Sequence, residues 1–257
     1  MRLPEQARIF GEPQRCSDGA LRRGRVAFYT ACCVLAMTVR IVLFGAGALA
    51  RESYEVVRRV RQAGGDVECV AFRVDASEDN NQTLLGLPVV SDPHRFVGDG
   101  AVRYCIAVGD PVSRCRIAKK LALEGALFES IVDPQAWIGA TCSIGKGSII
   151  FGYSSVTADS MVGRHVLINP GCTVAHDNRI DDFCSLSPGV DLAGHVECDE
   201  GCFLGTGAAV RPRIRLGRYA YVGAGSVVVR DIEPGIVVAG NPARPLKTGT
   251  RLATDAF

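Results

Sequence analysis

VGRHVLINPGCTVAHDNRIDDFCSLSPGVDL, residues 162–192, carries an aliphatic side chain at every sixth position, beginning with Val162. The same step extends in both directions without an insertion, from Ile138 to Val228, over sixteen consecutive positions. Fifteen of these positions are aliphatic and the other is Cys198. Neither the 3.6-residue period of a helix nor the two-residue period of a strand produces this spacing.

A second register supports the first, because a small or apolar residue lies four positions after most of these aliphatic residues. Asn178 interrupts this second register. Two inward positions in every six describe a triangular coil whose sides are short parallel strands, about 4.8 Å from those of the next coil. The pattern therefore predicts a β-helix of about five coils, roughly 25 Å tall. The second register comprises Cys142, Ser148, Ser154, Ser160, Val166, Cys172, Cys184, Val190, Val196, Cys202, Ala208, Ala220 and Ser226.

Composition limits the partners and the compartment. The 257 residues leave room for two domains, and a formal net charge of +2 with 22% charged residues argues against a nucleic-acid partner. No Cys-x-x-Cys pair of the kind that binds zinc occurs. Reduced thiols fit the cytoplasm, and we expect no membrane partner. Five of the eleven cysteines fall on inward repeat positions, where a thiol packs as a small hydrophobe: Cys142, Cys172, Cys184, Cys198 and Cys202.

Residues 1–36 form an extension with two interpretations. Residues 1–25 are polar and basic, and residues 26–39 form a mostly apolar run that resembles the start of a signal peptide. The run is too short for a convincing membrane span and leads directly into the first strand of the next domain. We expect a disordered extension or a natural start at Met37.

The segment that follows predicts a strand, a glycine turn, a helix and a second strand. Residues 39–44 form an apolar strand, Gly45-Ala46-Gly47 follows, residues 51–63 show helical spacing, and residues 67–74 lead to Asp75. A glycine turn at a helix N-terminus lets the backbone approach a phosphate, so the unit indicates a nucleotide site. Further strands over 87–90, 103–108 and 128–132 and a helix over 111–123 predict a half-size nucleotide-binding fold.

His176 is the strongest candidate for chemistry in the repeat. It lies two positions after the inward Val174, so it points outward near a corner of the coil, where it has no packing role. A neutral imidazole can accept a proton from an attacking amine or hydroxyl. Asp177 can hold the tautomer of His176 or raise its basicity. The alternative is that both residues belong to a solvated corner.

The order of these two parts resembles one known family, the sialic acid O-acetyltransferases and UDP-4-amino-sugar N-acetyltransferases. Its members make nucleotide-activated N-acylated sugars for glycans. The resemblance implies a small Rossmann-like domain followed by a left-handed parallel β-helix of hexapeptide repeats. It covers residues 39–247 and rests on IVLFGAGALARE, IAVGDPVSRCRIAKKL, INPGCTVAHDNRIDDFCSLSPGVDLAGHV and VVAGNPARPLK.

The resemblance also implies site residues. His176 matches the catalytic base, Asp177 the acid beside it, and the Gly194 amide the donor to the thioester oxyanion. Asn169 matches a sugar-site asparagine. The remaining matches are the UDP pocket at Gly45, Ala46, Gly47 and Asp75, and the backbone groups of Thr206 and Ala224, which hold the pantetheine of acetyl-CoA.

Three departures from the family pattern affect these expectations. The family commonly has a second histidine nine residues after the first, and Ser185 takes its place at the acetyl-CoA site. His195, about one coil above His176, either replaces that histidine in binding acetyl-CoA or has a surface role. The glycine turn continues as Ala48-Leu49-Ala50 instead of a polar sequence. Val74 replaces the first acid after the second strand. The resemblance therefore implies a nucleotide site but leaves open whether its base is uridine.

These observations predict an α/β plus all-β protein: a Rossmann-like nucleotide-sugar-binding domain over 37–132, a β-helix acetyltransferase domain over 133–247, and a tail over 248–257. The expected reaction is direct N-acetyl transfer from acetyl-CoA to a nucleotide-linked amino sugar, with His176 as general base and no metal. The family implies a homotrimer with acetyl-CoA between neighbouring β-helices.

Four alternatives remain open. An O-acetyltransferase acting on a sugar hydroxyl would use the same residues. A β-helix zinc enzyme of the carbonic anhydrase type would need His165, His176 and His195 to converge. A non-catalytic, nucleotide-sensing scaffold would bind nucleotide without acetyl-CoA turnover. A dehydrogenase is disfavoured because no hydride-transfer constellation is visible.

Overall fold

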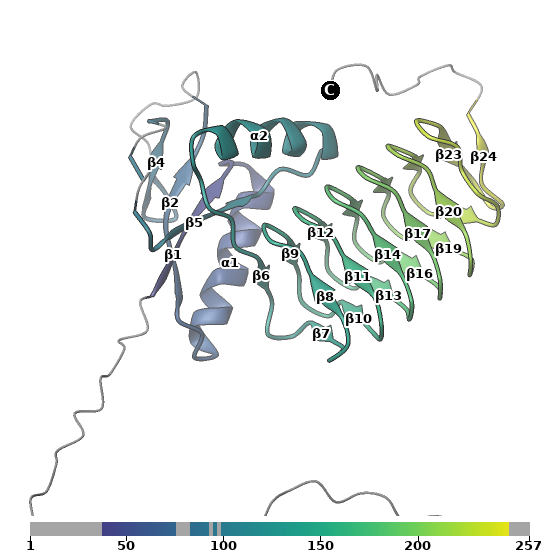
Figure 1. Cartoon of the computed structure of the whole chain (residues 1–257), viewed down its shortest axis with the longest axis horizontal. Coiled ribbons are helices and arrows are strands. Elements are labelled where there is room, and N and C mark those ends of the chain that lie inside the picture. The colour runs from purple at the N-terminus through teal and green to yellow at the C-terminus, as the bar shows by residue number, and fades with distance from the viewer. Residues whose placement is uncertain (1–37, 76–82, 93–94, 97–98, 247–257) are drawn as a thin grey trace, which may run out of the picture. The chain divides into compact units, whose positions relative to one another are not determined.

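The computed structural model describes residues 38–75, 83–92, 95–96 and 99–246 (Figure 1). The predicted extension over 1–36 and the predicted tail over 248–257 lie outside these residues. In the part of the chain that is described, no helix combines the length and apolar character that crossing a bilayer requires.

The first part is a five-stranded sheet with two helices. The strand order is β3-β4-β2-β1-β5, in which β4, β2, β1 and β5 run parallel and β3 is antiparallel to β4. The chain order therefore reverses direction between β1 and β5. The elements are β1 (Val39–Phe44), α1 (Ala48–Gln62), β2 (Val67–Arg73), β3 (Thr83–Leu84), β4 (Leu87–Val90), β5 (Val102–Ile106) and α2 (Pro111–Leu123).

Local sequence explains the two helices. In α1 the buried residues Ala50, Ser53, Val56 and Val57 return at helical spacing and face the sheet. Helix α2 begins at Pro111, whose fixed φ suits the first helical position. The preceding Asp110 accepts a hydrogen bond from the Ser113 amide at 2.7 Å, which satisfies one of the free N–H groups of the first turn.

The strand predicted over 128–132 is divided in the structure. Phe128 forms only an isolated bridge to Tyr104 of β5, whereas β6 (Ile131–Val132) pairs with β9 of the β-helix. Between them, the Ser130 hydroxyl donates to the Gly145 carbonyl at 2.8 Å. The apolar residues before and after Ser130 thus serve two different sheets, which periodicity alone does not distinguish.

The second part is the predicted parallel β-helix (Figure 1). Its two- and three-residue strands form three sheets, here called faces I, II and III. Face I contains β7 (Trp137–Ile138), β10 (Ser155–Val156), β13 (Thr173–Val174), β16 (Asp191–Leu192), β19 (Ala209–Val210) and β22 (Val227–Val228). Face II contains β8 (Ser143–Ile144), β11 (Met161–Val162), β14 (Arg179–Ile180), β17 (Glu197–Cys198) and β20 (Arg215–Leu216). Face III contains β6, β9 (Ile149–Ile150), β12 (Leu167–Ile168), β15 (Ser185–Leu186), β18 (Phe203–Leu204), β21 (Tyr221–Val222), β23 (Val237–Ala239) and β24 (Arg244–Pro245).

The register of the coils follows the sequence repeat. Val156 pairs with Val174, and Val174 pairs with Leu192, so each coil has eighteen residues. The second residue of each strand from β6 to β22 points inward, and a single hydrophobic core runs through the coils. Backbone amides of one coil donate to carbonyls of the next, such as Thr173 to Val190 at 2.9 Å. The fold prediction for this part is confirmed.

The inward cysteines are free thiols. Cys172, Cys184, Cys198 and Cys202 are buried, and all eight cysteines of the described residues are unpaired, as predicted. Burial raises the pKa of the Cys172 thiol to about 11, which keeps it protonated at neutral pH. These thiols are therefore packing residues rather than nucleophiles.

Helix α2 is attached to the β-helix by a buried arginine, Arg114, which is 1% exposed. Its Nε donates to the His165 carbonyl at 2.8 Å, and its Nη2 donates to the Phe183 carbonyl at 2.7 Å. The His165 ring lies in the same place, stacked on Phe183 and edge-on to Phe128. The corner between faces II and III therefore forms the junction between the two parts.

Candidate active site

The corner between faces I and II carries the candidate catalytic residues. At this corner one residue per coil adopts a left-handed conformation, with φ between 50° and 60° at Asp159, Asp177, His195 and Arg213. These residues are eighteen positions apart, so they form a column along the corner. Glycine is the usual residue for such a conformation. Here exposed polar side chains take these positions.

His176 and Asp177 form a hydrogen-bonded pair. Nδ1 of His176 lies 2.7 Å from Oδ2 of Asp177, and the two side chains are 58% and 44% exposed. The hydrogen bond with His176 is the main cause of an Asp177 pKa below its ordinary value, and the charge of His195 contributes. The carboxylate is therefore ionised at neutral pH and keeps the proton on Nδ1, which leaves Nε2 free to accept one.

The ring of His176 packs against the backbone of Gly194 in the next coil. A Cβ atom on Gly194 would lie 2.5 Å from Cε1 and 2.6 Å from Nε2 of His176. Within the described residues, the Gly194 amide donates to no other group, because the corner interrupts the ladder between coils. A free N–H group thus lies next to the ring of the candidate base.

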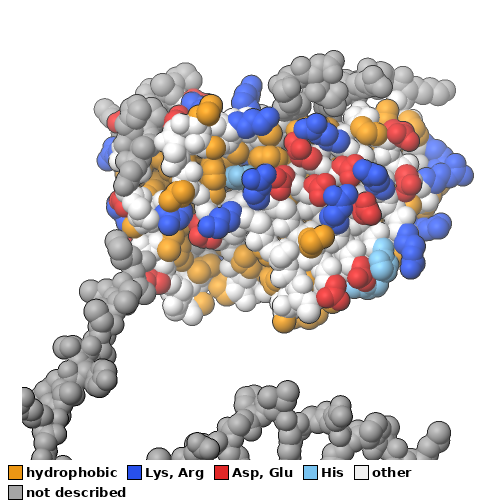
Figure 2. Space-filling model, in the orientation of Figure 1, with side chains coloured by type: hydrophobic (Ala, Val, Ile, Leu, Met, Phe, Trp, Pro, Cys, Tyr) orange, Lys and Arg blue, Asp and Glu red, His pale blue; other side chains and the backbone are white. Residues whose placement is uncertain are grey.

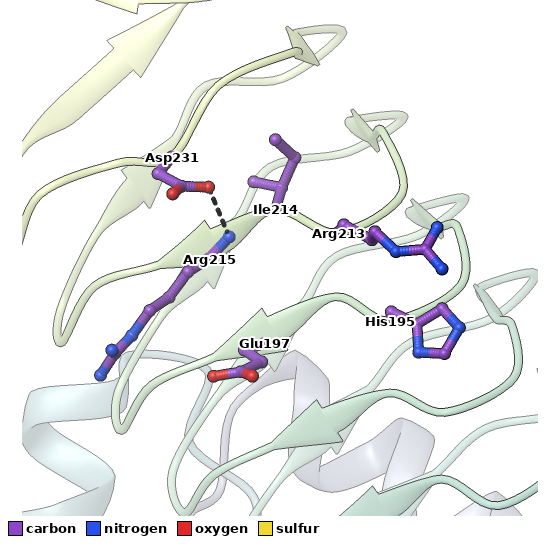
Figure 3. A pocket seen from close by; sticks show the side chains of 6 residues that line it. All are labelled: His195, Glu197, Arg213, Ile214, Arg215 and Asp231. Carbon is purple, nitrogen blue, oxygen red and sulfur yellow. Dashed lines mark hydrogen bonds between the residues drawn. The ribbon is translucent and has the colours of Figure 1, made fainter.

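His195 is also part of this cluster. Its Nε2 lies 3.7 Å from Oδ2 of Asp177, and its ring meets that of His176 edge-on with centroids 5.3 Å apart. His195 and Arg213 line a pocket of about 370 Å³ beside the pair, and Figure 3 shows both side chains on the same side of successive coils. In Figure 2 exposed histidines lie beside acidic and basic side chains at this part of the surface.

Asn178 is a site residue that the sequence analysis did not identify. Its amide side chain is buried, where its Nδ2 donates to the Ala175 carbonyl at 3.0 Å and its Oδ1 accepts from the Val196 amide at 2.6 Å. These bonds join the backbone just before His176 to the backbone just after His195. The signal in the sequence was the interruption of the second register two residues after His176.

Asn169, Thr206 and Ala224, predicted to bind the sugar and acetyl-CoA, lie at another corner, between faces III and I. Asn169 donates through its side-chain amide to the Leu186 carbonyl at 2.8 Å. Thr206 and Ala224 are exposed, and among the described residues their amides donate to no carbonyl. One and two coils below Thr206, Pro188 and Pro170 occupy the same corner position. The structure thus brings His176, Asp177, Gly194 and His195 together, but not these three residues.

The predicted nucleotide residues lie at the carboxyl ends of adjacent strands in the first part. Gly45 follows β1 with φ +120°, and a Cβ there would lie 3.0 Å from the Ala107 carbonyl, so the turn requires glycine. Ala46 and Gly47 are exposed before α1. Asp75 follows β2 and is paired with Lys120 at 2.5 Å, so its carboxylate is already engaged by α2.

Solved structures with the same architecture include sugar acetyltransferases. A point mutant of perosamine N-acetyltransferase from Caulobacter crescentus, in complex with CoA and GDP-perosamine, is 31% identical; the match covers 80% of this chain and 96% of that one, with a TM-score of 0.73. The acetyltransferase domain of PglB from Neisseria gonorrhoeae is 30% identical over 81% of this chain and all of that one, with a TM-score of 0.73. WeeI from Acinetobacter baumannii is 28% identical over 80% and 99%, with a TM-score of 0.70.

The chain belongs to the hexapeptide-repeat sugar acyltransferases. It is thus an acyltransferase with a left-handed β-helix, as the sequence resemblance implied. No family model matches the sequence, and no curated protein does.

In this acyltransferase Ser185 is buried instead of lying at an exposed binding site. Ser185, predicted at the acetyl-CoA site, is 1% exposed beneath the start of α2. Its hydroxyl donates to the Gly109 carbonyl and accepts from Nη2 of Arg114, both at 2.8 Å. Because its hydrogen bonds are made within the chain, the side chain is not free to contact a ligand.

The geometry of the acyltransferase also disfavours the zinc alternative, which needed three converging histidines. His165 lies at the corner between faces II and III, while His176 and His195 lie at the corner between faces I and II. Burial lowers the pKa of His165 to about 4, with Arg114 contributing. His165 is therefore a neutral packing residue at the junction.

Proposed function

We propose that this acyltransferase transfers an acetyl group from acetyl-CoA to the amino group of a nucleotide-linked amino sugar, a precursor of polysaccharide. The observation that carries the proposal is the exposed His176–Asp177 pair next to the free amide of Gly194. The similar perosamine N-acetyltransferase binds CoA and GDP-perosamine, which supports the same two substrate classes.

His176 acts as the general base in the proposed reaction. Its Nε2 accepts a proton from the sugar amine as the amine nitrogen forms a bond to the thioester carbonyl carbon. Asp177 holds the other ring nitrogen and stabilises the imidazolium that results. When the tetrahedral intermediate collapses, the carbon–sulfur bond breaks and the imidazolium returns the proton to the departing thiolate.

Gly194 stabilises the tetrahedral intermediate. A backbone N–H that has no partner in the next coil can donate to the developing oxyanion without first breaking a bond, so no reorganisation is needed during the reaction. Because Gly194 is buried against the His176 ring, the position of the oxyanion donor relative to the base is fixed.

The complete site requires more than one copy of the chain. Thr206 and Ala224, proposed to hold the pantetheine through their backbone, lie at one edge of face I, while His176 lies at the other edge. We propose a homotrimer in which the corner between faces III and I of one copy meets the corner between faces I and II of the next. Asn169 would then contact the sugar from the edge that carries Thr206.

Residues 37–132 form the proposed nucleotide-sugar-binding domain, and residues 133–247 the acetyltransferase domain. The Rossmann-like interpretation of the first is supported by the order β4-β2-β1-β5, which reverses beside Gly45. In such sheets ligands bind at the carboxyl ends of the strands where the order reverses. Gly45, Ala46 and Gly47 are therefore proposed to face the nucleotide diphosphate, with Asp75 nearby. The free thiols favour the cytoplasm as the compartment.

The test is a thiol-release assay with acetyl-CoA and a panel of GDP-, UDP- and dTDP-linked 4-amino sugars and free sialic-acid-type sugars. We expect turnover with one nucleotide-linked amine and a loss of about 10² to 10⁴ in kcat for His176→Ala. Arg211→Ala, an exposed substitution two residues before the column residue Arg213, is the control for surface charge.

Three other results would contradict parts of the proposal. Turnover with free sugars alone would make the enzyme an O-acetyltransferase. Near-wild-type rates for His176→Ala would exclude His176 as the base. Nucleotide binding by calorimetry with no turnover of any acceptor would identify the chain as a nucleotide-sensing scaffold.

A further inference from the structure

Two histidines approach one carboxylate oxygen at the active-site corner. Oδ2 of Asp177 lies 2.7 Å from Nδ1 of His176 and 3.7 Å from Nε2 of His195. We propose that His195 is a positioning residue, which shares the Asp177 carboxylate with His176 and thereby orients the base. The inference rests on the proposed role of His176 and assigns His195 a role within it.

The backbone holds His195 where it can do this. The His195 amide donates to the His176 carbonyl at 3.0 Å, and both Asp177 and His195 have left-handed φ values, 58° and 60°. The two rings are perpendicular, with an interplanar angle of 89°. The edge of one ring therefore meets the face of the other, and the nitrogens that point toward Asp177 converge from two coils.

A second partner matters because the pair is open to solvent. Asp177 is 44% exposed, so water competes for its oxygens and the side chain can leave His176. At 3.7 Å His195 is in electrostatic contact with Oδ2 but not hydrogen-bonded to it, so it does not displace the 2.7 Å bond to His176. With a partner in each coil, Asp177 has fewer alternative rotamers, and the tautomer and orientation of His176 are maintained.

The other charged groups near His195 are engaged elsewhere or are cationic. Glu197, in the same coil, is paired with Arg179 at 3.2 Å. In the coils above, Asp231 accepts from the Arg215 amide, and the Arg215 side chain is paired with Asp199 at 3.0 Å. Arg213 lines the same pocket and is a cation (Figure 3). Asp177 is thus the carboxylate that pairs with His195.

The first test is steady-state kinetics of His195→Ala and His195→Gln. We expect His195→Ala to lower kcat about tenfold, the size of a typical coupling between contacting residues, with KM for acetyl-CoA unchanged. His195→Gln keeps an N–H donor and should recover most of the rate.

The second test is a double-mutant cycle with Asp177→Asn. If His195 acts through Asp177, the double variant should be no slower than Asp177→Asn alone. Asp159→Asn is the matched control, because Asp159 occupies the same corner position one coil earlier and has no histidine partner in the described structure. Its rate should equal that of the wild type.

Two outcomes would overturn the inference. Additive effects of His195→Ala and Asp177→Asn would show that His195 acts independently of Asp177. A raised KM for acetyl-CoA with unchanged kcat would make His195 a donor-binding residue. Failure of the proposed function is distinguishable from both, since in that case His176→Ala would itself retain the wild-type rate.

Discussion

The imidazole of His176 lies against the Cα atom of Gly194, so close that a methyl group on Gly194 would lie 2.5 Å from Cε1 of the ring. The ring can occupy this position only because residue 194 has no side chain. The candidate base and the candidate oxyanion donor are thus coupled by contact as well as by chemistry.

Gly194→Ala should therefore lower kcat by about 10², because a ring displaced by an ångström no longer meets the amine in line. The measurement is kcat of the purified variant, with thermal unfolding to verify the fold. Gly100→Ala is the control, since a Cβ there meets nothing within 4 Å. Equal rates for Gly194→Ala and wild type would contradict the proposed arrangement.

Asn178→Ala should weaken both the fold and the site. The substitution leaves the Val196 amide unpaired in the core, at a cost of about 2 kcal/mol in the free energy of unfolding. Asn178→Ser should recover most of this, because the Ser160 hydroxyl, one coil below, accepts from the Asn178 amide in the way that Asn178 accepts from the Val196 amide. Urea unfolding and kcat of both variants test this; an unaltered Asn178→Ala protein would refute it.

Arg114→Met should lower the free energy of unfolding, because the arginine bonds α2 to the β-helix. The arginine donates to carbonyls of His165, Phe183 and Cys184, and burial lowers its pKa to about 10. Removing it leaves buried carbonyls without donors, which should cost about 3 kcal/mol or more in the free energy of unfolding. Arg116→Met, exposed on the same helix, should change urea unfolding by less than about 0.5 kcal/mol.

The neutral His165 should make the fold sensitive to acid. Its pKa is lowered from 6.5 to about 4 by burial, so below about pH 6.5 the unfolded chain binds a proton that the folded chain does not. The free energy of unfolding should fall by about 2 kcal/mol from this group between about pH 7 and pH 5. In His165→Phe this contribution should vanish. The measurement is urea unfolding of both proteins at about pH 7 and pH 5. An equal change in the free energy of unfolding between the two pH values in both proteins would contradict the prediction.

Much of the fold was predictable because each six-residue repeat forms one side of the triangular coil. An aliphatic residue at every sixth position, such as Val174, is inward in the structure, and the strands of the first part begin and end close to the predicted residues. The division of the segment 128–132 was not predictable. Phe128 before Ser130 and Ile131 and Val132 after it are all apolar, and only tertiary pairing decides which sheet each joins.

The candidate site was predictable where it depends on period and less so where it depends on side-chain contacts. The outward position of His176 and the proximity of His195 follow from the eighteen-residue coil. The burial of Ser185 under α2 could not be predicted from the period, because it depends on a helix from another part of the chain. The role of Asn178 could not be predicted from it either. That role depends on hydrogen bonds that an interrupted pattern indicates but does not specify.

The eighteen-residue coil without insertions has an evolutionary consequence. Within the β-helix, each coil bonds to the coil before it and the coil after it, so a substitution at the corner between faces I and II is constrained by two neighbours rather than by the whole domain. The coil that carries His176 can therefore diverge separately from the coil that carries Ala224, with which it shares no bond. Acceptor preference and donor preference can then be inherited, lost or exchanged as separate modules of one gene.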